Sequence, residues 1–164
     1  SGGKVLQVVG SNVAGGNISI TSTTYTDTGC TATITPSSSS SKILAFARGS
    51  YTQGATDDTV SGGIKLLRNV GGGSFSDLVI PMADTTGPYE QQLELTAGGN
   101  INGCTFNMNY SFLDDPDTTS ACIYKLQARV YSSGSSHQWY FGNSGGGGGA
   151  QTQEMIAMEI LSDS

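Results

Sequence analysis

The stretch CIYKLQARVYS at residues 122–132 decides the fold, because apolar and polar side chains alternate along it. One face collects Tyr124, Leu126, Ala128 and Val130, and the other collects Lys125, Gln127 and Arg129. A period of two is that of a β-strand with one face in the core and one in solvent. The pattern therefore predicts a half-buried strand, with Leu126 facing inward and Gln127 facing outward.

Similar runs recur every ten to fifteen residues or so along the chain, with turn residues between them. They predict strands at Lys4–Val9, Ile18–Thr26, Thr31–Thr35, Ile43–Tyr51, Gly62–Asn69, Phe75–Met82, Tyr89–Thr96, Thr105–Phe112, Cys122–Ser132, Gln138–Asn143 and Glu154–Leu161. No window longer than ten residues has a clean helical period, so almost no helix is expected. About ten short antiparallel strands predict an all-β fold, a two-sheet antiparallel β-sandwich of the jelly-roll type.

Some connections and faces can also be predicted. Glycines at 71–73 supply positive φ to a hairpin loop over residues 69–74. If the consecutive runs 105–112 and 122–132 form a hairpin, Phe112 faces Cys122 across it. The last run places Ile156, Met158 and Ile160 on one face and Glu159 on the other. Gly145–Gly149 is costly to order and predicts a flexible loop before that run.

The composition sets the class of protein and its partners. A chain of 164 residues, with 24 Gly and 12% charged residues, fits a single β-sandwich domain over 1–164, in which residues 1–3 resemble a cloning scar. The net charge is −6 and the seven Lys and Arg are widely spaced, so nucleic acid is not an expected partner. The apolar runs are too short for membrane insertion. A neutral polysaccharide or a protein receptor fits this surface better.

Three cysteines cannot all pair within the chain. In the predicted hairpin Cys104 would lie opposite Val130, at the far end of the ladder from Cys122, so these two cannot reach each other. Reduced, partly buried thiols are expected, as in a protein that folds in a host cytosol.

A candidate ligand-binding patch comprises His137, Trp139 and Tyr140, beside the glycine run. Aromatic rings offer large contact area at low entropic cost and stack on the apolar faces of sugars. The alternative for His137 is a loop position next to a buried aromatic strand. The alternative for Trp139, the only Trp of the chain, is a place in the core or in an interface between protomers.

Asp114, Asp115 and Asp117 crowd around Pro116, and oxygen ligands of this kind could hold calcium. The favoured interpretation is a Pro-anchored turn, in which Asp makes local hydrogen bonds. The pair Asp57–Asp58 is a weaker version of the same pattern. Paired carboxylates could also hydrolyse glycosides, but so small a domain offers little material for a deep cleft. No nucleophile or phosphate-loop motif occurs, so we expect no catalytic residue, no cofactor and no enzyme.

Several segments of the sequence resemble segments of a known family. They are GKVLQVV at 3–9, TATITPSSSSSKIL at 31–44, SFLDDP at 111–116 with TSA at 119–121 and YKLQ at 124–127, and MIAMEI at 155–160. In this order they resemble tail-fibre and related virion proteins of tailed phages, many of them marine or cyanobacterial. The resemblance spans nearly the whole chain and brings no catalytic motif. It implies a homotrimer located in the virion and assembled in the host cytoplasm.

The sequence leaves three functions open. The first is a tail-fibre-like domain that binds a host cell-surface glycan or protein receptor as a homotrimer. The second is a structural virion protein, such as a capsid decoration or head fibre, that binds other virion proteins. The third, less favoured, is a polysaccharide depolymerase.

Overall fold

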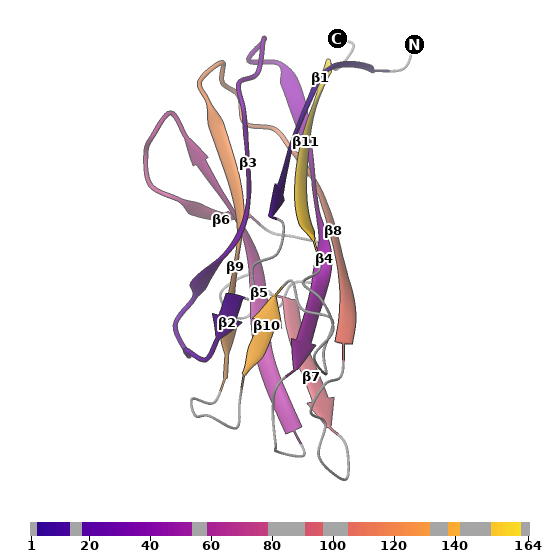
Figure 1. The fold of residues 1–164 in the computed structure, drawn as a ribbon. Helices are drawn as coiled ribbons and strands as arrows, with labels where there is room; N and C mark the ends of the chain where they lie inside the picture. Colours follow the sequence, from indigo (N-terminus) through magenta and orange to yellow (C-terminus); the bar gives the residue numbers. More distant parts are fainter. Residues whose placement is uncertain are drawn as a thin grey trace.

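The computed structural model describes residues 3–13, 18–53, 59–78, 91–96, 105–131, 138–141 and 152–161. These residues form strands and connections without a helix, and each predicted run overlaps one of the strands (Figure 1). The strands are β1 (Lys4–Val13), β2 (Ile18–Ile20), β3 (Thr26–Ile34), β4 (Ser41–Gln53), β5 (Thr59–Val70), β6 (Ser76–Leu78), β7 (Gln91–Thr96), β8 (Thr105–Asp114), β9 (Cys122–Val130), β10 (Trp139–Phe141) and β11 (Gln153–Leu161).

The strands form two antiparallel sheets that pack face to face (Figure 1). Sheet A has the order β1-β11-β4-β10-β2. β11 and β10 follow one another along one edge of β4, and β8 pairs with its opposite edge. Sheet B has the order β3-β9-β5-β6, and β7 shares with β6 the outer edge of β5. The paths β1-β11-β4-β8 and β3-β9-β5-β7 face each other, which confirms the predicted β-sandwich and gives it jelly-roll connectivity.

The core lies between the inner faces of the two sheets. Strand β9 contributes Cys122, Tyr124, Leu126, Ala128 and Val130, all fully buried. Gln127 lies on the outer face, where its amide donates to Asp27, so the predicted facing of Leu126 and Gln127 is confirmed. Alternation identified this strand because its two faces differ sharply in polarity.

β8 and β9 do not form the hairpin on which the expected separation of Cys104 and Cys122 depends. β8 pairs with β4 in sheet A, where Phe112 lies opposite Ala45. β9 pairs with β3 and β5 in sheet B, so Cys122 lies opposite Ile34 and Val70. The connection over residues 115–121 therefore crosses from one sheet to the other. In this arrangement both edges of β9 are paired, one with β3 and the other with β5.

The glycine-rich loop after β5 is a hairpin turn, as predicted. Gly71 and Gly72 have φ of +58° and +78°, a region that glycine enters without strain. Asn69 closes the loop: its side-chain oxygen accepts a hydrogen bond from the Gly72 amide at 3.1 Å, and its amide donates to the Gly73 carbonyl. β6 then returns along β5, with Leu78 opposite Leu66.

Two cysteines of the described chain, Cys30 and Cys122, are buried free thiols. Burial, with a smaller contribution from the charge of Glu154, raises the pKa of Cys30 to about 12. At neutral pH this thiol is therefore protonated and unreactive.

Cys104 and the glycine run 145–149 lie outside the described residues. No helix in the described ranges is long and apolar enough to cross a membrane.

Candidate binding surfaces

Trp139 lies in the core of the sandwich, with 2% of its surface exposed. Its ring centroid is 5.5 Å from that of Tyr51 and 6.5 Å from that of Phe141, and the rings are tilted as aromatic pairs prefer. Of the two alternatives for Trp139, the structure shows the core position. Tyr140 is half-buried on the opposite face of β10, where its hydroxyl donates to Gln138 at 2.7 Å. His137 lies outside the described residues.

Gly62 of β5 makes room for the indole of Trp139. A Cβ at this position would lie 2.7 Å from Cη2 of Trp139 and 2.3 Å from the carbonyl oxygen of Arg129. Both distances are shorter than real carbon contacts allow, so only glycine fits. The close approach holds β10 of sheet A against sheet B.

Two of the aspartates around Pro116, Asp114 and Asp115, have separate partners. Asp114, at the end of β8, accepts hydrogen bonds from Arg68 at 2.7 Å and from the Tyr124 hydroxyl at 2.6 Å. Asp115 forms an ion pair with Lys42 at 3.5 Å. Among the described residues no group of three possible metal ligands comes together, and Asp57 and Asp58 lie outside them.

Asp114 joins the two sheets at the turn. Its side chain is 6% exposed, whereas that of Arg68 on β5 is 22% exposed. Burial acts to lower the pKa of Arg68, but the hydrogen bond and charge of Asp114 outweigh it and raise that pKa. Burial and the hydrogen bond to Asp114 both raise the pKa of Tyr124, so its phenol stays protonated and donates. These contacts favour the turn interpretation of the aspartates.

Glu159 of β11 is a buried charged residue. Its neighbours in the chain, Met158 and Ile160, are apolar and lie on the outer face of the strand. The amide and hydroxyl of Ser37 donate to one carboxylate oxygen at 2.7 and 2.6 Å, and Gln7 donates to the other at 2.6 Å. Burial acts to raise the pKa of Glu159, but these hydrogen bonds outweigh it and lower the pKa to about 2. The carboxylate thus ties β1, the connection before β4 and β11 together.

Glu159→Gln is expected to flatten the acid side of the stability curve. Because the folded-state pKa of about 2 lies below the ordinary 4.5, Glu159 stabilises the fold above pH 4.5. That contribution disappears as the pH falls from 4.5 towards 2. Thermal midpoints measured across this window should fall less steeply for Glu159→Gln than for the wild type. Asp115→Asn, at an exposed ion pair, is the control, and equal slopes for Glu159→Gln and the wild type would contradict the assignment.

The outer face of sheet A carries most of the apolar side chains that the core does not use. Strand registers place Val8 beside Met158, Met158 beside Leu44, and Leu44 beside Leu113, a continuous row across four strands. We call the surface around this row the apolar face; it comprises Val5, Val8, Leu44, Phe46, Leu113, Ile156, Met158 and Ile160. Val5, Val8 and Leu113 are 51%, 58% and 54% exposed.

The same sheet becomes polar towards the β10 end. Beyond the row of Ile156 and Phe46, the next row on this face comprises Asn12, Glu154, Arg48 and Asn109 across the same four strands. Arg48 forms an ion pair with Glu154. The residues of this row line a depression of about 430 Å³, which we call the amide depression. A second depression of about 300 Å³ adjoins it along β4 and β8, with Phe46 on its wall. Amides and an ion pair offer both donors and acceptors, the chemistry that recognises hydroxyl groups.

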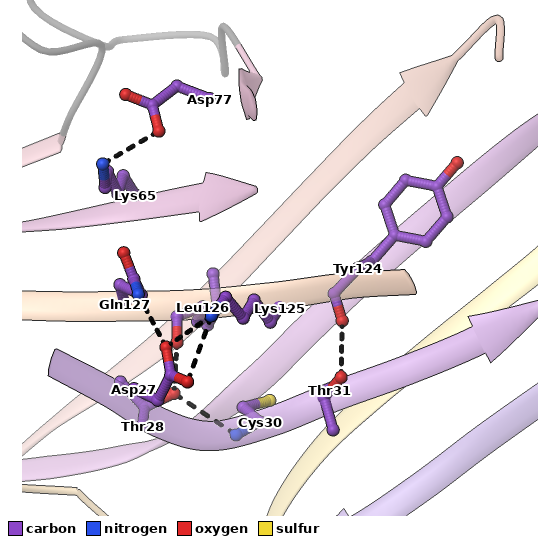
Figure 2. A network of polar contacts seen from close by, with 10 residues as sticks. All are labelled: Asp27, Thr28, Cys30, Thr31, Lys65, Asp77, Tyr124, Lys125, Leu126 and Gln127. Atoms are coloured by element: carbon purple, nitrogen blue, oxygen red, sulfur yellow. Dashed lines mark hydrogen bonds and ion pairs between the residues drawn. The ribbon is translucent and has the colours of Figure 1, made fainter. Parts of the chain in front are cut away.

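The outer face of sheet B is polar and internally paired (Figure 2). Lys125 and Gln127 on β9 both donate to Asp27 of β3, at 2.8 and 2.7 Å, and Lys65 of β5 pairs with Asp77 at 2.8 Å. Burial acts to raise the pKa of Asp27, but these hydrogen bonds and the Lys125 charge outweigh it and lower that pKa. Sheet B thus presents a solvated surface, in contrast to sheet A.

Comparisons with known proteins identify the fold but no family. No family model and no curated protein matches the chain. A chain in the structure of infectious bursal disease virus strain Gx has a similar fold, with TM-score 0.51, 10% identity and 98% coverage of this chain. This chain spans 34% of that one.

Weaker similarities are to the T13 infectious bursal disease virus particle and to Eiger TNF from S. frugiperda. Their TM-scores are 0.48 and 0.37, at 10% and 9% identity. They cover 96% of this chain in both cases, and 36% and 94% of the other chains. The resemblance to tail-fibre proteins stays a prediction.

Proposed function

We propose that this protein is a structural protein of a virus particle, which assembles with copies of itself and with other virion proteins. The observation that carries the proposal is the apolar face of sheet A. A contiguous apolar patch with a polar rim is typical of surfaces that contact other proteins. The similarity of fold to a chain of a virus structure, over 98% of this chain, supports the same assignment.

The finer assignment is a tail-fibre-like domain that binds the host surface as a homotrimer. The amide depression favours it, because its donors and acceptors suit a neutral glycan. Because Trp139 is buried, we place the candidate site away from β10, on the outer face of β1, β11, β4 and β8. A shallow polar site of this kind binds weakly, so display on three protomers would raise the avidity. Binding without hydrolysis is proposed, since glycoside hydrolysis needs a pair of carboxylates and Glu154 is the one carboxylate among the lining residues.

Association with particles tests the structural assignment. An antibody against the purified domain should detect the chain in virus particles banded on a density gradient from the source culture. The chain should remain with the particles after a salt wash. A chain found only in the soluble fraction of the lysate would contradict the assignment.

Binding to immobilised glycans tests the finer assignment. Asn109→Ala removes an amide from the wall of the amide depression, and we expect at least a tenfold loss of glycan binding. Thr33→Ala, at an exposed position on sheet B, is the matched control and should bind as the wild type does. Equal binding by Asn109→Ala and the wild type would remove the depression as the site.

A further inference from the structure

We propose that the apolar face of sheet A is the surface through which copies of this chain pack together. The inference rests on the proposed self-assembly and specifies which surface of the chain forms the contact. The face is continuous, because the row from Val8 to Leu113 crosses β1, β11, β4 and β8 without a polar side chain. Phe46 and Ile156 extend it on one side of this row, and Val5 and Ile160 on the other.

The size of the face suits a protein interface. Four strands spaced about 4.8 Å apart give a width of about 15–20 Å, and the stretch Ile156–Ile160 of β11 gives a length of about 16 Å. The plan area is therefore about 300 Å², and the relief of the side chains adds to it. A stable interface buries about 800 Å² per partner, so the apolar face would form the centre of such an interface and the surrounding polar surface its rim.

The charges of the face favour a second copy of this chain over another occupant. The chain has a net charge of −6, so most approaches between two copies are repulsive. The four charges that flank the apolar face cancel in pairs, Lys42 with Asp115 at 3.5 Å and Arg48 with Glu154. Two such faces meet without net repulsion, and neither a strongly basic nor a strongly acidic partner would find a complement here.

A matched pair of charge substitutions tests the interface. Val8→Asp and Leu113→Asp place a carboxylate at the two most exposed apolar positions, 58% and 54% exposed, on the two outer strands of the face. Thr33→Asp adds the same charge at an exposed strand position of sheet B. In sedimentation at tens of micromolar protein, the wild type and Thr33→Asp should have a multiple of the 16.9 kDa chain mass. Val8→Asp and Leu113→Asp should sediment at the monomer mass.

Folding of the variants is checked by circular dichroism. Leu113→Met, which keeps an apolar side chain at this position, should have the same assembled mass as the wild type. Assembly of Val8→Asp and Leu113→Asp at the wild-type mass would overturn the interface and leave self-assembly standing. A wild type that is monomeric at this concentration would overturn both the interface and the proposed self-assembly. Dissociation of Thr33→Asp alone would assign the interface to sheet B and contradict the proposal.

Discussion

Asp114→Ala is expected to destabilise the protein by about 3–5 kcal/mol, because it leaves a half-buried guanidinium and a buried hydroxyl without their acceptor. Both carboxylate oxygens of Asp114 lie 2.7 Å from Arg68, and one also accepts from Tyr124 at 2.6 Å. The three residues come from β8, β5 and β9, so the substitution also releases sheet A from sheet B at this end. Urea denaturation followed by fluorescence gives the free energy of unfolding.

Asp115→Ala is the matched control, since it removes the neighbouring carboxylate. Its partner is Lys42, and the two side chains are 61% and 40% exposed, so the loss should stay below about 1 kcal/mol. A difference of less than about 1 kcal/mol between the two variants would mean that the Asp114 contacts contribute little to stability.

Trp139→Ala is expected to cost about 3–5 kcal/mol, the range for removing a large aromatic side chain from a core. The indole fills the space between Tyr51, Phe141 and the Cβ-free surface of Gly62. The neighbouring rings of Tyr51 and Phe141 are themselves buried in the core, so a cavity would remain. The thermal midpoint should fall by several degrees or more.

Tyr140→Ala is the control on the same strand, because Tyr140 is half-buried on the opposite face. It should cost clearly less, since it removes one contact to Gln138 and little core volume. An unchanged midpoint for Trp139→Ala together with a loss of ligand binding would return Trp139 to the role of a binding residue.

The strands were predictable because alternation and turn residues recur at regular intervals. In β9 the two faces differ in polarity, so the sequence also identified the core face. In β11 the sequence pattern separated Glu159 from Ile156, Met158 and Ile160. In the structure these three apolar side chains lie on the outer face of sheet A, and Glu159 lies on the buried side. On the core side of sheet A the alanines Ala45, Ala47 and Ala157 alternate with larger residues such as Ile43 and Met155, so the core face gave a weaker sequence signal there.

The candidate surfaces were harder to predict. The amide depression draws on Asn12, Arg48, Asn109 and Glu154, which come from four strands far apart in the chain. Only the registers of sheet A place them in one row, and no local motif encodes those registers. Trp139 was singled out because it is unique, although a unique large aromatic serves a core as well as a binding site.

The pairing of β4 has a consequence for synthesis on the ribosome. β4 ends at Gln53 and β11 begins at Gln153, so one edge of β4 has to wait for about a hundred more residues. At about 5–20 residues per second this takes about 5–20 s, during which a nascent chain carries an open strand edge. Neighbouring nascent chains on one messenger RNA offer each other the same edge. Products that terminate before β11 should therefore aggregate, and full-length yield should rise when a chaperone is supplied.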